Sequence, residues 1–275
     1  MQDWAHEAIE RIVARILEAL ARGDEVGPLA LTLLLRRYGA TDRQDLADAL
    51  GPALAAAAER DFAAAAPSDA DWLTLFAETC AVSDDARLRG AAERLIAALR
   101  RQWAAAADVE SAMWSIGACL SAADLVDPRE LVPAAIDELE RIVSATYRPG
   151  AGIGHLVGRP ETVRGLLADH VRAASALLTA YELTARLPYG MLAEELMQFS
   201  LRQPLVLDCE AARVLMRLAA LHATAAYREA AVLAPGVDYA NDAARVLAAL
   251  EPEFRAHGVD AAVFGLALAE WTGRP

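Results

Sequence analysis

Carboxylic acids recur near the beginnings of the predicted helices, and glycoside hydrolysis needs two carboxyl groups, one as acid and one as base or nucleophile. If these helices surround a cavity, their first turns bring the acids face to face. We select Asp169 paired with Asp208 or Glu210 as candidate catalytic residues. The alternative is that each acid caps free N–H groups and offsets the helix dipole, which would explain every one of them individually. The full set is Asp69, Asp71, Asp108, Glu110, Asp169, Asp208, Glu210 and Asp260.

A glycine-rich stretch, residues 149–164, is the longest predicted loop; it contains His155 and is followed by His170. Histidine is the side chain best suited to exchange a proton near neutral pH, as a sugar epimerase requires. We therefore add His170 to the catalytic candidates, and His155 and Arg172 to the substrate-binding candidates. The alternative is an ordinary glycine-rich connector beside structural histidines.

Two tryptophans, Trp72 and Trp114, lie near the first turns of predicted helices. An indole face can stack on a sugar ring, so both are substrate-binding candidates, together with Glu110. Packing in the core is the competing explanation for both tryptophans.

Cofactor and metal chemistry has little support. The chain has no lysine, which excludes Schiff-base and phosphate-loop lysines. Cys80, Cys119 and Cys209 lie far apart, and no HxH, HExxH or CxxC spacing occurs. We expect no metal, no cofactor and buried, inert thiols.

The charge balance limits the classes of partner that the chain is expected to bind. There are 26 basic and 39 acidic residues, a net charge of −13, which argues against nucleic acid and against an anionic membrane surface. No apolar run suggests a signal peptide or a membrane span, so we expect a cytoplasmic protein. A small sugar ligand is the expected partner, and a homodimer or another protein partner stays open.

Apolar residues recur at helical spacing along almost the whole chain, and no strand is predicted. Glycine and proline separate the segments, as at Gly27-Pro28 and Asp127-Pro128. The predicted helices span 3–21, 28–38, 42–59, 69–82, 86–104, 109–122, 128–147, 166–184, 188–202, 208–222, 225–233, 240–256 and 259–272.

The helices alternate between more apolar and more amphipathic segments, which indicates stacked helical hairpins. The more apolar ones form a predicted inner ring: 28–38, 69–82, 109–122, 166–184, 208–222 and 259–272. The last inner helix lacks a following partner and the first helix lacks a preceding one. Pairing these two closes the ring, which predicts an all-α (α/α)6 toroid as a single domain over residues 1–275.

Several stretches resemble a known family. Residues 167–170 (LADH) and 176–184 (ALLTAYELT) resemble an inner-helix pattern of the YyaL-type thioredoxin-domain proteins, which include the spermatogenesis-associated protein 20 group. Residues 147–155 (YRPGAGIGH) resemble their glycine loop, and 211–219 (AARVLMRLA) their next helix. The resemblance is best over 125–272 and implies the six-hairpin fold without the thioredoxin domain. This fold is shared with glycosidases and N-acylglucosamine-type epimerases.

Two functions follow. The first is a carbohydrate-active or carbohydrate-binding toroid, of glycosidase or epimerase type, with a cavity at the N-terminal ends of the inner helices. The second is a noncatalytic interaction or scaffold domain that retains the fold. A deep polar cavity would favour the first, and a cavity plugged by side chains the second.

Overall fold

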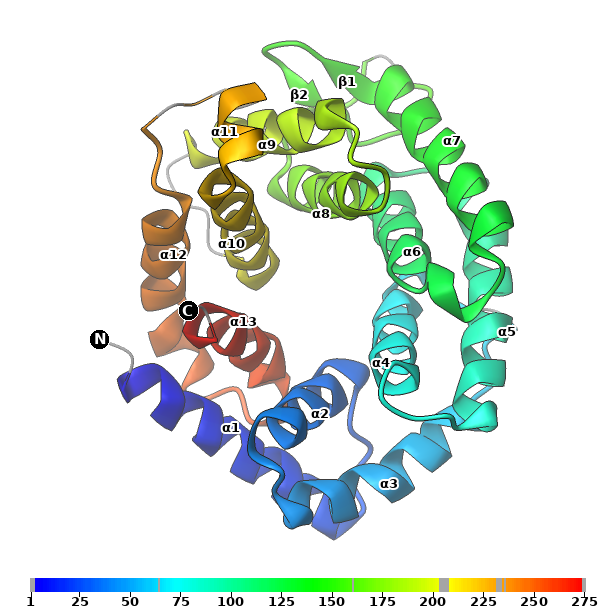
Figure 1. Cartoon of the computed structure of the whole chain (residues 1–275), viewed down its shortest axis with the longest axis vertical. Helices are drawn as coiled ribbons and strands as arrows, with labels where there is room; N and C mark the ends of the chain where they lie inside the picture. The colour runs from blue at the N-terminus through cyan, green and yellow to red at the C-terminus, as the bar shows by residue number, and fades with distance from the viewer. Residues whose placement is uncertain are drawn as a thin grey trace.

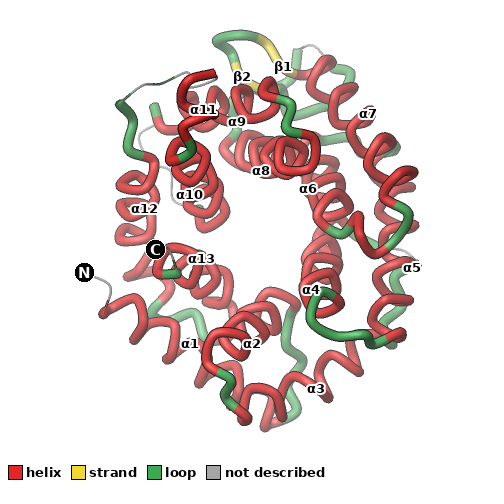
Figure 2. The backbone as a smooth tube through the Cα atoms, in the orientation of Figure 1, coloured by secondary structure: helices red, strands yellow, loops and turns green. Residues whose placement is uncertain are grey.

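The computed structural model describes residues 3–63, 65–159, 161–202, 208–230, 234 and 236–273. Over these residues the chain is almost entirely helical (Figure 2). The α-helices are α1 (Asp3–Arg22), α2 (Pro28–Thr41), α3 (Gln44–Ala58), α4 (Ala70–Cys80), α5 (Ala86–Trp103), α6 (Val109–Ser121), α7 (Pro128–Thr146), α8 (Leu167–Thr184), α9 (Leu187–Leu201), α10 (Cys209–Ala223), α11 (Ala225–Ala230), α12 (Tyr239–Phe254) and α13 (Ala262–Thr272). Short 3-10 helices are η1 (Pro67–Asp69), η2 (Ala123–Leu125) and η3 (Val259–Ala261).

The helices form two concentric rings (Figure 1). The inner ring consists of α2, α4, α6, α8, α10 and α13, and each of these helices packs against the next one around the ring. The ring is closed, because α13 packs against α2 and also against α1. The predicted all-α (α/α)6 toroid, with the first helix pairing with the last, is therefore confirmed.

Aspartates fix where many of the helices begin. The N-cap side chains accept hydrogen bonds from backbone N–H groups of the first turn, which leaves fewer unpaired donors at the helix start. The caps are Asp85 of α5, Asp108 of α6, Asp127 of α7, Asp208 of α10 and Asp238 of α12. Proline at the first position, as in Pro28 and Pro128, adds a pre-set φ angle.

Small side chains let neighbouring inner helices approach closely. A Cβ added at Gly117 of α6 would lie 3.5 Å from the Cα of Ala176 in α8, an ordinary van der Waals contact. Alanines of the outer helices are buried in the same way, including Ala91 and Ala92 of α5. Alanines and glycines interspersed among the larger buried leucines and isoleucines therefore let the two rings pack tightly.

One element was missed by the sequence prediction. Strands β1 (Tyr147–Arg148) and β2 (Gly152–Ile153) form an antiparallel hairpin, with Tyr147 opposite Ile153. Two-residue strands are too short to show an alternating pattern, so periodicity cannot reveal them. The predicted helix 225–233 corresponds to α11, and its last three positions lie outside the described residues.

Candidate active site

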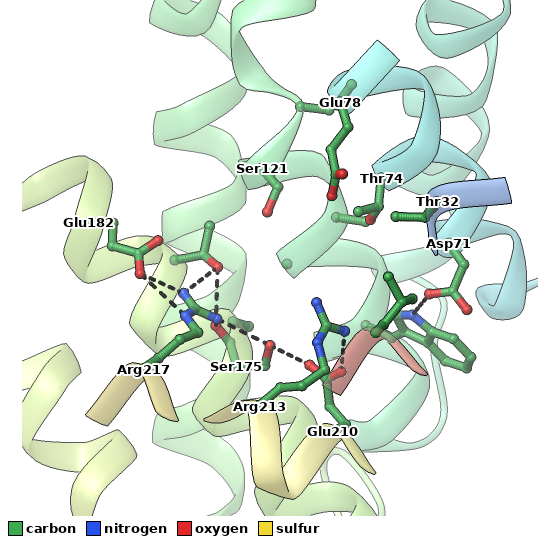
Figure 3. Close-up of a pocket in the computed structure, with 18 of the residues that line it drawn as sticks. Thr32, Asp71, Thr74, Glu78, Ser121, Ser175, Glu182, Glu210, Arg213 and Arg217 are labelled. Atoms are coloured by element: carbon green, nitrogen blue, oxygen red, sulfur yellow. Dashed lines mark hydrogen bonds and ion pairs between the residues drawn. The ribbon is translucent and has the colours of Figure 1, made fainter. Parts of the chain in front are cut away.

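The inner ring encloses a cavity of about 790 Å³ (Figure 3). The sequence predicted this cavity at the N-terminal ends of the inner helices. Its wall does include the first-turn residues Leu29, Asp71 and Glu210, but it is not confined to those ends. The wall also continues past the C-terminal ends of α4 and α6, to Ala81 and Ala122. A volume of this size accommodates a small ligand of one or two sugar rings.

Three side chains from three inner helices meet on the cavity wall: Asp71 of α4, Trp114 of α6 and Arg172 of α8. The indole Nε1–H of Trp114 donates to Asp71 Oδ1 at 3.1 Å. The guanidinium carbon of Arg172 lies 3.8 Å from the centre of the Trp114 ring. One face of this indole is thus already covered by a cation, so sugar stacking on that face, as predicted for Trp114, is blocked.

The carboxyl group of Asp71 has a perturbed acidity. Burial raises its pKa to about 6, and this effect outweighs the opposing influence of Arg172 and of the hydrogen bond from Trp114. A carboxyl with this pKa carries a proton for much of the time just below neutral pH. It is therefore suited to donate that proton to a leaving group.

A second carboxyl on the wall behaves in the opposite way. Glu210 of α10 accepts hydrogen bonds from Ser175 Oγ at 3.0 Å and from Arg213 Nη1 at 2.8 Å. Burial alone would raise its pKa, but Arg213 and Arg172 lower it to about 2. Glu210 is consequently a fixed negative charge, while Asp71 titrates near physiological pH.

A chain of ion pairs continues from Glu210 around the inner ring. Arg213 also binds Glu270 of α13, and Glu270 in turn contacts Arg36 of α2. Arg36 then binds Glu78 of α4 with two hydrogen bonds, of 2.6 and 2.9 Å. The chain links four inner helices and neutralises most of the charges that it contains. Arg172 is different: no carboxylate of the described residues forms a direct ion pair with it, although its charge lowers the pKa of both Asp71 and Glu210.

The predicted catalytic residues Asp169 and His170 are fully buried, and neither lies on the cavity wall. His170 accepts a hydrogen bond from the Ile153 N–H and lies 3.1 Å from Ser200 Oγ. Burial lowers its pKa to about 4, so the ring is neutral at physiological pH. The first turn of α8 is covered here by the glycine-containing hairpin. A Cβ at Gly152 would lie 2.4 Å from His170 Nε2, so only glycine leaves room for the imidazole.

Asp169 instead forms a pair with His155, whose Nδ1 lies 3.1 Å from both carboxylate oxygens. Burial raises the pKa of Asp169, and the hydrogen bond from His155 opposes that shift. The backbone N–H of Glu110 also acts to lower the pKa of this carboxyl. The pair ties the loop to α8, and none of the three side chains is part of the cavity wall.

The remaining candidates are also divided between residues on the cavity wall and residues away from it. Asp208 caps α10 by accepting from the Ala211 N–H at 2.8 Å, and it lies off the wall. Trp72 is buried beside Phe76, with Arg60 over its ring, which is the packing role considered for it. Of the nine predicted site residues, the wall contains Glu210, Trp114 and Arg172.

Sequence reasoning missed the importance of two wall residues. Asp71 belonged to the set of first-turn acids, but nothing in the sequence set it apart from the helix caps. Its raised pKa depends on burial inside the closed ring, and its hydrogen-bond partner Trp114 lies 43 positions away on another helix. Arg213 falls one turn after Glu210, and this i, i+3 spacing of opposite charges was the available signal for their pair.

Within the described ranges, no group of three or more His, Cys, Asp or Glu side chains is arranged to hold a metal ion. No helix in the described part of the chain combines the length and the apolar character that crossing a bilayer requires.

Comparisons with known proteins give a structural match. No protein-family model and no curated protein sequence matches the chain. The unsaturated glucuronyl hydrolase from Bacillus sp. GL1, described as responsible for the degradation of glycosaminoglycan, superposes with a TM-score of 0.72 at 12% identity, over 100% of both chains. An unsaturated glucuronyl hydrolase specific for heparin gives 0.72 at 13% identity, over 99% of this chain and 98% of the other. At this identity the likeness shows the fold, the six-hairpin α/α toroid of these hydrolases.

Proposed function

We propose that this chain is a glycoside hydrolase that acts on a short acidic saccharide bound in the ring cavity. The observation that carries the proposal is the group formed by Asp71, Trp114 and Arg172. It combines a carboxyl whose pKa is raised to about 6 with a cation that no carboxylate of the described residues contacts directly, on the wall of a cavity of about 790 Å³.

Arg172 supplies the binding half of the proposal. A guanidinium forms two parallel hydrogen bonds with a carboxylate, and stacking on Trp114 restricts its orientation. The two structural neighbours are hydrolases of unsaturated glucuronyl residues, and a glucuronyl residue carries one carboxylate. A substrate with such an end residue would satisfy Arg172.

Asp71 is the proton donor in the proposed reaction. In hydrolysis the C–O bond breaks as the leaving oxygen takes the proton of Asp71. Water then adds its hydroxyl to the sugar carbon and returns a proton to the carboxylate, which restores the acid. Glu210 stays ionised at the same pH and serves as a fixed acceptor for sugar hydroxyls.

An epimerase is less well supported, since the described part of the cavity wall contains no histidine. The noncatalytic alternative predicts a plugged ring, whereas the cavity is open and carries polar groups (Figure 3).

The test is an assay with disaccharides that end in an unsaturated glucuronyl residue, followed by mass spectrometry of the products. We expect wild-type protein to release the second sugar and Asp71→Asn to lose at least about 100-fold in kcat, because removal of a general acid costs that much. The control is Asp137→Asn, at an exposed position on the outer helix α7. Binding without turnover by wild type would support the noncatalytic alternative, and absence of binding would refute the proposal.

A further inference from the structure

The two ends of the cavity differ in exposure. Near the N-terminal turns the wall side chains are withdrawn from solvent, and that of Glu210 is 17% exposed. Towards the C-terminal ends they open to solvent, and the side chain of Glu182 is 56% exposed. The exposed wall residues Ala81, Ser121 and Ala220 all lie at or beyond the last turns of their helices. Figure 3 shows this axis, with Glu78 and Ser121 at one end of the cavity and Glu210 at the other.

The cavity is therefore a pit rather than a symmetrical tunnel. Its floor contains Asp71, Arg172 and Glu210, and its mouth lies at the C-terminal ends of the inner helices. The described loops that lead into the inner helices contribute no residue to the wall. A ligand that reaches Arg172 accordingly passes the mouth first.

The mouth carries little positive potential. Arg217 is paired with Glu182 at 3.0 Å, and Arg36 is paired with Glu78. Glu270, in the last turn of α13, is paired with Arg36 and Arg213, and the other charged side chains among the described wall residues at this end are Arg89 and Asp124. The inner helices run in the same direction, because an outer helix returns the chain between one inner helix and the next, so their negative dipole ends gather at this mouth. The whole chain adds a net charge of −13.

We propose that the substrate enters through this mouth with its single anionic group leading, and that its trailing part is uncharged. This inference rests on the proposed function, since it takes Arg172 as the anchor. It narrows the substrate class to a short saccharide with one carboxylate at the leading end. A chain with further sulfate groups would leave them among helix C-terminal ends, where Arg89 is the one cation of the described wall residues that is not in an ion pair.

Cys80 offers a direct probe of this route. It is the last residue of α4, it lies on the cavity wall near the mouth, and it is half-buried. Burial raises the pKa of its thiol, so alkylation needs mildly alkaline buffer. Cys119 and Cys209 are buried and serve as internal controls.

The experiment combines calorimetry with alkylation by iodoacetamide, using two matched disaccharides. Both carry a terminal unsaturated glucuronyl residue, and only one carries sulfate groups on the second sugar. We expect the unsulfated ligand to bind at least about tenfold more tightly, and added salt to narrow the difference by screening the repulsion. When the unsulfated ligand is present at ten times its Kd, it should slow the alkylation of Cys80 by about tenfold, since only the free protein reacts.

The outcomes separate the two proposals. If neither disaccharide binds, the proposed function fails. Equal or tighter binding of the sulfated ligand overturns the inference about the trailing part. Binding of the unsulfated ligand that leaves the alkylation rate of Cys80 unchanged overturns the inferred route.

Discussion

At the scale of single residues, the surroundings of two first-turn carboxyls give them opposite properties. Asp71 and Glu210 both occupy the second position of an inner helix and both lie on the cavity wall. Burial raises the pKa of Asp71 to about 6, because the opposing indole N–H of Trp114 and the nearby Arg172 do not compensate for it. Glu210 is paired with Arg213, and its pKa falls to about 2. Two carboxyls with separated pKa values allow one site to hold a proton donor and a fixed negative charge together.

The pH dependence of stability tests the environment of Asp71. Its folded pKa lies above its ordinary value of 3.8, so its ionisation favours the unfolded state. Wild type should lose up to about 3 kcal/mol relative to Asp71→Asn as the pH rises from 4 to 7, at roughly 1.4 kcal/mol per pKa unit. Urea unfolding of both proteins across this range measures the difference. If the difference in unfolding free energy between wild type and Asp71→Asn does not change with pH, the raised pKa of Asp71 is contradicted.

The same pKa predicts the pH profile of activity. If Asp71 donates the proton, kcat/KM for the glucuronyl disaccharide should fall as the pH rises through about 6, because the protonated fraction of Asp71 falls. Initial rates between pH 4.5 and 8 would give this profile. A rate that increases through pH 6 would assign Asp71 a different role.

Gly152 tests the packing of the loop on α8. Its φ is +69°, and a Cβ there would lie 2.4 Å from His170 Nε2. Gly152→Ala should therefore cost about 3 kcal/mol, from the strained backbone and the steric clash together. Gly158 is a matched control, with φ +72° and no atom within 4 Å of the added Cβ, and should lose only about 1 kcal/mol. Thermal unfolding compares the two, and equal losses would show that the clash is relieved at no cost.

At the scale of elements, periodicity and breakers were sufficient to predict the helices. All thirteen described α-helices fall within a few residues of predicted segments, because glycine and proline separate long amphipathic runs. Side-chain direction was harder to predict. The first turn of α8 directs Asp169 and His170 away from the cavity, under a hairpin that the sequence did not reveal. One turn later Arg172 reaches the cavity, as predicted.

Ion pairs between elements also depend on the closed ring. Glu270 joins α2 to α10 through Arg36 and Arg213, whose positions in the sequence are 177 residues apart. Glu270→Gln should destabilise the fold by about 2 kcal/mol, because it leaves two half-buried cations with fewer partners. The loss should shrink as the pH falls and the carboxylate protonates in wild type, since pairing with arginine lowers the Glu270 pKa. Glu182→Gln, at a more exposed pair, should cost less than about 1 kcal/mol. Urea denaturation measures both variants, and equal losses of unfolding free energy would contradict a special role for Glu270.

At the scale of the whole molecule, closure of the ring determines the cavity. The sequence predicted closure because the last inner helix is too apolar to end an open array, and α13 indeed packs against α1, α2 and α10. Phe264 of α13 is buried at this seam and stacks on Phe254 of α12 at 5.1 Å. The cavity wall, in contrast, combines side chains from all six inner helices, so its polar groups could not be assembled from local patterns.

Phe264→Ala tests how much the seam contributes. We expect the free energy of unfolding to fall by about 3–4 kcal/mol, with a single cooperative transition, because the void left by the missing phenyl group weakens the contacts of α13. Val82→Ala, at a residue that is 76% exposed, should stay within about 0.5 kcal/mol of wild type. Chemical denaturation followed by circular dichroism measures both. Two separate transitions in the Phe264→Ala variant would show that the seam unfolds independently of the rest.

The most direct test of the central claim, that an acidic saccharide binds Arg172 in the ring cavity, is isothermal titration calorimetry. Wild type and Arg172→Gln are titrated at pH 6 with an unsulfated unsaturated glucuronyl disaccharide and with its methyl ester, which lacks the negative charge. We expect either change to weaken binding by at least about tenfold, the effect of losing one charge-assisted hydrogen bond, and we expect the two losses not to add. Equal affinity of wild type for the acid and the ester, or of wild type and Arg172→Gln for the acid, would contradict it.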